Sequence, residues 1–172
     1  MKQKEKNPVL TGFMGSGKTT VGIRLSYRLR RPVEDTDRLI ERREGLRISE
    51  IFAEKGEAYF RERETELLRE LGARKYPCVY SVGGGTPVNP ENRALLKGLG
   101  TVVYLRVRPE TVYERLRGDT TRPLLQCDNP LERIRGLIES RREAYEACAD
   151  VILDVDDMEI EEISDRIILY VR

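Results

Sequence analysis

The chain contains neither histidine nor tryptophan among its 172 residues. Histidine is the side chain that most often serves as a general base near neutral pH, and it is also the commonest metal ligand. Any acid–base chemistry in this protein must therefore use carboxylates, lysine, tyrosine or cysteine.

Cysteine is scarce, with only Cys78, Cys127 and Cys148, which lie far apart and show no CxxC spacing. An odd number of dispersed cysteines argues against a zinc site or a disulfide framework and suits a reducing compartment. The sequence also shows neither a signal-peptide core nor an apolar run long enough to span a membrane. We therefore expect a cytoplasmic protein that does not associate with membranes.

Neither sign of charge dominates, since 31 basic residues stand against 30 acidic ones and the net charge is +1. This balance gives no support for electrostatic binding of nucleic acid. Apolar residues make up 39% of the chain and charged residues 35%, which is typical of a globular protein. The length fits one domain over residues 1–172, and no pattern suggests an oligomer interface, so we expect a monomer.

Short apolar runs alternate with longer helical patterns, which predicts βαβ units and a parallel sheet. The first strand is expected to begin at residues 9–10, and the others are expected at residues 32–35, 78–82, 102–105 and 151–153. Helices are expected at residues 17–30, 37–44, 49–76 with a break near 56, 90–99, 109–117, 130–149 and 160–171. The fold class is therefore α/β: a doubly wound five-stranded parallel sheet with flanking helices. Residues 118–129 lack clear periodicity and are expected to form a mobile lid.

A phosphate-binding loop is the strongest motif in the chain. Residues 12–19 read GFMGSGKT, which fits the pattern GxxxxGK[ST] between an apolar run and a helical pattern. Glycines let backbone N–H groups surround an anion, and the following helix adds the positive end of its dipole. Lys18 can reach the β and γ phosphates, and the Thr19 hydroxyl can bind Mg²⁺. The loop indicates nucleotide binding, and the absence of an NKxD sequence argues against a GTPase.

Three further motifs follow predicted strands or lie in the lid, and each has a simpler interpretation. Asp35 and Asp37 at a strand end could serve a cation and a hydroxyl, or Asp37 could only cap a helix. Glycines 83–85 could expose N–H groups to an anion or form a plain turn. Arg122 could close over a phosphoryl group or lie on the surface. Residues 60–64, taken alone, are typical of a solvated helix face.

Together and in this order, the motifs resemble those of the shikimate kinase family. The resemblance covers roughly residues 8–153 and rests on these segments: residues 12–22 (GFMGSGKTTVG), 35–37 (DTD), 48–52 (ISEIF), 56–57, 60–64 (FRERE), 82–85 (VGGG), 122–125 (RPLL), 141 with 145, and 149–150. Membership implies a P-loop kinase that uses ATP and Mg²⁺ to phosphorylate the 3-hydroxyl of shikimate, in the route to aromatic amino acids. Glu34 and residues 143–144 depart from the common pattern at positions without a chemical role.

The resemblance also implies a role for individual residues on the nucleotide side. Lys18 and Arg122 would be catalytic, Thr19 would bind Mg²⁺ directly, and Asp35 would bind it through water. The residues implied to bind ATP are Gly15, Ser16, Gly17, Lys18, Thr19, Thr20, Arg115 and Arg122.

On the acceptor side, the helices over residues 37–76 are implied to bind shikimate. Asp37 would contact the reacting hydroxyl, either accepting its proton or only orienting it. Arg61 and Arg141 would bind the carboxylate, a task suited to planar guanidinium groups, and Glu64 would hold Arg61. Gly83, Gly84 and Gly85 would assist in binding shikimate.

Two other functions remain open at this point. The chain could phosphorylate another small molecule, such as gluconate or a nucleoside monophosphate, on the same scaffold. It could also be an ATP-binding sensor that has lost activity, although intact Lys18, Asp35, Asp37 and Arg122 argue against this. Release of ADP with and without shikimate would separate the three.

Overall fold

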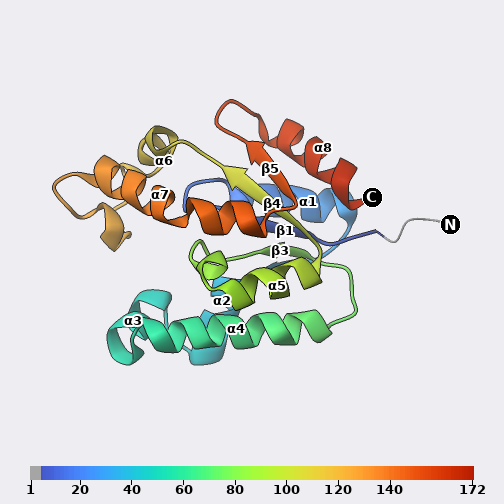
Figure 1. The fold of residues 1–172 in the computed structure, drawn as a ribbon, viewed down its shortest axis with the longest axis horizontal. Helices are drawn as coiled ribbons and strands as arrows, with labels where there is room; N and C mark the ends of the chain where they lie inside the picture. The colour runs from blue at the N-terminus through green and yellow to red at the C-terminus, as the bar shows by residue number, and fades with distance from the viewer. Residues whose placement is uncertain (1–4) are drawn as a thin grey trace.

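The computed structural model describes residues 5–172, apart from the side chain of Leu124. The expectation that the sequence has no signal-peptide core concerns in part residues 1–4, which lie outside this range. Its centre is a five-stranded sheet in which all neighbouring strands are parallel, in the order β2-β3-β1-β4-β5 (Figure 1). The strands are β1 (Pro8–Thr11), β2 (Val33–Asp35), β3 (Val79–Ser81), β4 (Thr101–Arg106) and β5 (Val151–Asp154). Because β1 lies between β3 and β4, the chain reverses direction across the sheet there, and ligands bind at the carboxyl ends of strands beside such a point.

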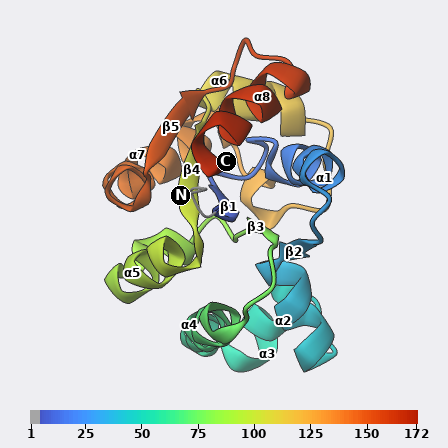
Figure 2. The same ribbon diagram turned by 90° about the vertical axis from the view of Figure 1, so that its right-hand side faces the viewer.

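Helices cover both faces of this sheet. Helices α1 and α8 pack together on one face, α5 and α7 lie on the other, and α2, α3 and α4 form a group at the β2 side of the molecule (Figure 2). The helices are α1 (Lys18–Leu29), α2 (Thr36–Glu44), α3 (Ile48–Lys55), α4 (Glu57–Ala73), α5 (Pro90–Leu99), α6 (Pro109–Leu116), α7 (Pro130–Cys148) and α8 (Ile160–Val171), with short 3-10 helices η1 (Thr86–Val88) and η2 (Pro123–Leu125). Within residues 5–172, none of these helices combines the length and apolar character needed to cross a membrane.

Side chains along the strands point alternately to the two faces of the sheet, and an apolar core lies on each face. In β1, fully buried Leu10 belongs to the cluster that contains Leu25 of α1 and Ile167 of α8. Its neighbour Val9 points to the other face and belongs to the cluster that contains Leu96 of α5. Since successive strand residues face opposite sides, both cores hold the central strand in place. This rigid strand carries the loop that follows it.

The expected five strands, their parallel arrangement and the flanking helices are confirmed, but some boundaries were wrong. The helix expected to run to residue 76 ends at Ala73, and Arg74 after it is extended. Pro77 disfavours helical conformation at Tyr76, so the helix could not reach its expected end. The expected break at Gly56 is present, where φ is 85° between α3 and α4. The two 3-10 helices were not expected, since three-residue elements leave no periodic pattern. One of them, η2, lies within residues 118–129.

Candidate active site

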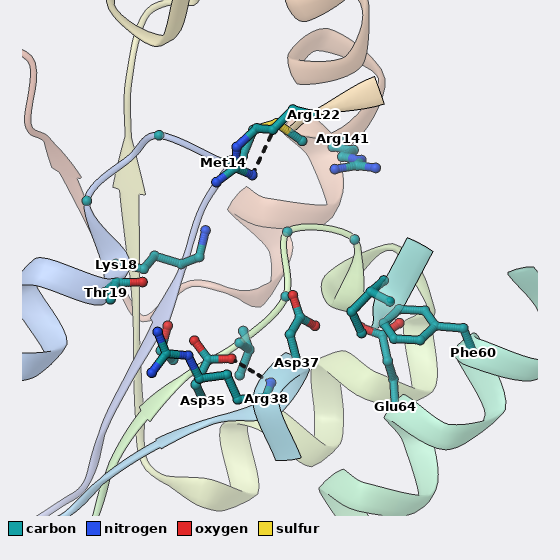
Figure 3. Close-up of a pocket in the computed structure, with 18 of the residues that line it drawn as sticks. Met14, Lys18, Thr19, Asp35, Asp37, Arg38, Phe60, Glu64, Arg122 and Arg141 are labelled. Carbon is teal, nitrogen blue, oxygen red and sulfur yellow. Dashed lines mark hydrogen bonds between the residues drawn. The ribbon is translucent and has the colours of Figure 1, made fainter. Parts of the chain in front are cut away.

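A cavity of about 560 Å³ opens at the carboxyl ends of the strands (Figure 3). It is lined by residues from the loop after β1, the start of α2, helices α3 and α4, the loop after β3, residue 122 and helix α7. All of the sequence-predicted site residues except Ser16 and Arg115 line it, namely Gly15, Gly17, Lys18, Thr19, Thr20, Asp35, Asp37, Arg61, Gly83, Gly84, Gly85, Arg122 and Arg141. Segments that are far apart in the sequence therefore meet at one edge of the sheet.

The P-loop, residues 12–19, follows β1 and leads into α1. Gly12 must be glycine, since its φ is 148° and a Cβ there would lie 2.7 Å from the carbonyl oxygen of Leu105. Lys18 Nζ donates to the carbonyl oxygens of Gly12 at 2.5 Å and Phe13 at 3.2 Å. Burial lowers the pKa of Lys18 to about 8, although the nearby carboxylates of Asp37 and Asp35 oppose the shift. Lys18 is thus a desolvated cation held at the mouth of the loop.

Ser16 and Arg115 contribute to the loop without lining the cavity. The Ser16 side chain is buried, and its Oγ has no hydrogen-bond partner within the part of the chain that the structure describes. Arg115, at the end of α6, donates from a guanidinium nitrogen to the carbonyl oxygen of Gly15 at 2.7 Å. Arg115 therefore holds the P-loop backbone in place in this structure.

Asp35, the last residue of β2, and Asp37, in the first turn of α2, have different environments. The Asp35 side chain caps α2 by accepting a hydrogen bond from the Arg38 backbone N–H at 3.1 Å. The helix begins at Thr36 and not at residue 37, so the alternative that Asp37 is the helix cap is wrong. Asp37 Oδ1 is buried and has no hydrogen-bond partner among the described residues. Asp37 as a residue lines the cavity, so its carboxylate group is placed to meet a ligand there.

The pKa of Asp37 is raised to about 6, chiefly by burial and then by repulsion from Asp35 and Glu64, while Lys18 and Arg61 act in the opposite direction. Figure 3 shows Asp37 facing the space between Lys18 on one side and Glu64 and Phe60 on the other. At pH 7 most of the carboxyl group is ionised, and it can accept a hydrogen bond or a proton from a nearby hydroxyl.

Arg61 projects from α4 toward the loop after β3. Its guanidinium donates to Glu64 Oε1 at 2.6 Å, and the Glu64 side chain is only 1% exposed. A second bond of 3.2 Å reaches Glu57. Gly85 makes this approach possible, because a Cβ there would lie between 2.5 and 2.8 Å from the Arg61 guanidinium. Arg61 is therefore held on two sides with part of its fork still directed to the cavity.

Arg141 enters the cavity from α7 and lies against the same glycine loop as Arg61, since a Cβ on Gly84 would lie 3.6 Å from one of its guanidinium nitrogens. Its guanidinium carbon lies 5.7 Å from the centre of the Phe13 ring, in a cation–π contact. Across residues 5–172 no carboxylate forms a salt bridge with it within 4.0 Å. One turn further on, the Tyr145 hydroxyl donates to the Gly84 carbonyl oxygen at 2.5 Å and fixes the glycine loop against α7. Arg141 can thus bind an anion without first breaking an ion pair.

Arg122 reaches the cavity from the segment at residues 118–129. Its Nε donates to Asp119 Oδ2 at 3.1 Å, and one terminal nitrogen lies 3.8 Å from the Met14 sulfur (Figure 3). The Asp119 carboxylate is held in turn by the Thr121 backbone N–H at 2.8 Å. These contacts hold the Arg122 guanidinium above the P-loop.

One wall of the cavity is apolar, and no role was predicted from the sequence for the residues that form it. Ile48, Phe52 and Phe60 line the cavity, and the two phenylalanine rings lie 5.1 Å apart. These residues fall in motifs that were recognised, but apolar residues at helical spacing look the same whether they face a core or a pocket. Other lining residues without a prior assignment are Met14, Arg38, Ser81, Val82 and Leu116.

The oxygen atoms of Thr19 and Asp35 suit a hard cation. Among residues 5–172 there is no group of three or more histidine, cysteine, aspartate or glutamate residues that could form a protein cage for a metal. Mg²⁺ is usually held by one or two protein oxygens together with phosphates and water, so this sparse donor set fits it.

Known proteins with similar sequences and structures point to one family. A family model described as shikimate kinase matches residues 14–172. The shikimate kinase of Burkholderia pseudomallei (strain 1710b) is 45% identical over 148 residues, which are 86% of this chain and 80% of that protein. The shikimate kinase of Thermus thermophilus is 46% identical over 160 residues, or 92% of this chain and 86% of that protein. A solved structure of the Acinetobacter baumannii shikimate kinase in complex with shikimate superposes with a TM-score of 0.87 at 39% identity, over 95% of this chain and 90% of that one.

Proposed function

The chain belongs to the shikimate kinase family, and we propose how the residues of its cavity transfer the γ-phosphoryl group of ATP to the 3-hydroxyl of shikimate. The protein is an ATP-dependent kinase that acts on shikimate. The roles of its individual residues, the use of Mg²⁺ and the movement of residues 118–129 are the parts proposed.

One observation carries the assignment of the site. Lys18, Asp37, Arg61 and Arg141 come from four separate segments and line a single cavity of about 560 Å³. A cavity of this size falls in the usual range for small-molecule sites. The cations at its two ends match the two anionic groups of the reactants, the triphosphate and the carboxylate, and Asp37 lies between them.

The nucleotide occupies the P-loop end. Backbone N–H groups of residues 15–20 surround the phosphates, and Lys18 contacts the phosphoryl group that is transferred. Thr19 and Asp35 hold Mg²⁺, which neutralises charge on the phosphate oxygens when it is bound. Arg115 supports the loop through its bond to Gly15 and borders the nucleotide from outside the cavity. Ser16 contributes through its backbone, since its side chain is buried.

Shikimate occupies the other end of the cavity. Its carboxylate lies between Arg61 and Arg141, close to the loop formed by glycines 83–85. Arg141 has no salt-bridge partner among the described residues, and Arg61 is aligned by Glu64, so both forks are ready before the ligand arrives. The apolar wall formed by Phe52 and Phe60 packs against the carbon ring.

Asp37 then acts on the acceptor hydroxyl. Its carboxylate accepts a hydrogen bond from the 3-hydroxyl and orients the oxygen toward the γ-phosphorus. As the new P–O bond forms and the bond to the ADP oxygen breaks, the hydroxyl proton passes to Asp37. Lys18 and Arg122 stabilise the charge on the transferring group, which is the main catalytic task in phosphoryl transfer.

Residues 118–129 act as a lid in this proposal. Arg122 already lies above the P-loop, and closure of the segment brings it onto the phosphates and excludes water, which otherwise competes as the acceptor. The residues of a single chain are enough to line the cavity, and we propose that the protein acts as a monomer.

A coupled assay of ADP release tests the proposed function. The purified protein with ATP and Mg²⁺ should release ADP rapidly only when shikimate is added. Gluconate and nucleoside monophosphates serve as matched acceptors from related kinases and should give no more than the background rate. Equal rates with and without shikimate would overturn the proposal and favour a non-catalytic ATP-binding protein.

A further inference from the structure

A buried chain of polar groups lies behind the proposed carboxylate site. Glu64 Oε1 accepts the bond from Arg61, and its other oxygen, Oε2, accepts a hydrogen bond from the Thr86 hydroxyl. Thr86 is the first residue of η1 and is only 1% exposed. Both oxygens of a buried carboxylate are thus occupied, one by a guanidinium and one by a neutral hydroxyl.

Helix α5 fixes the position of Thr86. Asn92 Nδ2 donates to the Thr86 carbonyl oxygen at 3.0 Å, and Asn92 Oδ1 accepts from the Thr65 hydroxyl at 2.8 Å. Asn92 is 1% exposed and Thr65 is 7% exposed. These hydrogen bonds hold Thr86 in place, so its hydroxyl, which donates to Glu64, has little freedom to move.

The surroundings of Glu64 show why this hydroxyl matters. A Cβ placed on Gly83 would lie 2.7 Å from Asp37 Oδ1, 3.2 Å from Glu64 Oε2 and 3.2 Å from the Thr86 hydroxyl, so these three groups converge on one point. Without the Thr86 hydroxyl, Glu64 Oε2 would be a buried oxygen facing the Asp37 carboxylate. Buried carboxylate oxygens are costly when unpaired, and Glu64 would rotate to find another donor. Such a rotation would also release Arg61.

We propose that Thr86 is a positioning residue for acceptor binding, which acts through Glu64 to keep the Arg61 guanidinium aligned with the substrate carboxylate. This inference rests on the proposed role of Arg61. Thr86 touches neither reactant, so it affects shikimate binding and leaves the nucleotide side of the cavity unchanged.

Steady-state kinetics of Thr86→Val provide the test, since valine keeps the shape and removes the hydroxyl. We expect the KM for shikimate to rise about tenfold, as for a lost hydrogen bond to a buried charge. The kcat and the KM for ATP should stay within about twofold, and Thr86→Ser should restore the KM. Thr101→Val is the matched control, because Thr101 is buried at the opposite end of the sheet and should leave all constants unchanged.

A double-mutant cycle with Glu64→Gln decides whether Thr86 acts through Glu64. In the Glu64→Gln background, Thr86→Val should change the KM for shikimate by less than about twofold. The full tenfold change in that background, or a normal KM in the single variant, would overturn the proposal. If Thr86→Val is too unstable to assay, Thr86→Ala in the same cycle gives the same decision.

Arg61→Ala separates failure of this inference from failure of the proposed site. If Arg61→Ala raises the KM for shikimate but Thr86→Val does not, only the role of Thr86 is wrong. If Arg61→Ala also leaves this KM unchanged, the carboxylate site itself is misassigned and the role of Thr86 is overturned with it.

Discussion

The two ends of the cavity are built in different ways. The nucleotide end is built mainly on one continuous segment, residues 12–19, in which backbone groups surround the ligand and glycines give them room. The acceptor end is assembled from side chains on α2, α4 and α7 (Figure 3), together with the backbone of the glycine loop after β3. One end is therefore fixed by local conformation, whereas the other depends on how distant elements pack.

This difference determines what a substitution can do at each end. Backbone contacts survive most side-chain changes, so the nucleotide end is vulnerable mainly at its charged groups, Lys18 and Arg122. The acceptor end depends on a series of contacts in which Arg61 is held by Glu64 and Glu64 by Thr86. Changes at the nucleotide end should therefore lower kcat, and changes at the acceptor end should raise the KM for shikimate.

The largest effect is expected for Arg122→Ala at the nucleotide end. Arginines that stabilise a transferring phosphoryl group contribute roughly 10³–10⁵ in kcat in known cases, so we expect kcat to fall about 10³-fold or more. The KM for shikimate should change little. Arg117→Ala is a matched control, since Arg117 lies at the end of α6 with an exposed side chain paired to Glu114. Unchanged turnover in Arg122→Ala would remove this residue from the chemistry.

A somewhat smaller effect is expected for Asp37→Asn, between the two ends. Loss of a group that accepts the proton of the acceptor lowers rates by roughly 10²–10⁴, and we expect a fall of about 10²–10³ in kcat. The variant should fold normally, which circular dichroism would check. Near-normal turnover would mean that Asp37 has no part in the reaction, since the structure already shows that it does not cap α2.

At the acceptor end, Arg61→Ala should raise the KM for shikimate about 10²-fold, as expected when one partner of a buried charge-assisted contact is lost. The KM for ATP should remain close to that of the wild type. Arg63→Ala, two residues along α4, controls for loss of charge on the same helix, since Arg63 pairs with Glu66 at 2.8 Å. If Arg61→Ala instead weakened ATP binding, the division of the cavity into a nucleotide end and an acceptor end would be wrong.

The same contrast explains how much could be predicted from the sequence. The P-loop has a fixed spacing in one segment, and the neighbouring elements could be read from periodicity. The Arg61–Glu64 pair could be anticipated because residues three apart meet on a helix, and the ion pair is present at 2.6 Å.

Other features depend on packing and could not be predicted. Asp35 caps α2, whereas Asp37 Oδ1 has no hydrogen-bond partner within residues 5–172, yet both aspartates have the same capping preference in the sequence. The bond between Arg115 and Gly15 joins residues 100 positions apart. Phe60 belongs to the apolar core together with other residues of its helix and also lines the cavity, and only the structure shows this second role.

The smallest effect is expected in the stability of Asp37→Asn. It tests whether burial between the two ends of the cavity raises the pKa of Asp37. The pKa of Asp37 is raised from 3.8 to about 6, so the unfolded chain releases this proton at lower pH than the folded one does. Its contribution to stability is therefore fully present below about pH 4 and is lost as the pH rises through about 6. Two pKa units correspond to roughly 3 kcal/mol, and we expect about 1–2 kcal/mol, because asparagine also removes the attraction to Lys18.

Asp37→Asn should therefore be more stable than the wild type at pH 7.5 by this amount, with the difference vanishing toward pH 4. Urea unfolding at several pH values would measure it, with Asp157→Asn as an exposed control that should show no such trend. A gain in stability together with the loss of turnover would show that the folded protein carries the cost of a desolvated carboxylate for the sake of its reaction. Equal stability of the two proteins at pH 7.5 would instead mean that the Asp37 carboxylate is well solvated, and that burial does not tune it for the acceptor hydroxyl.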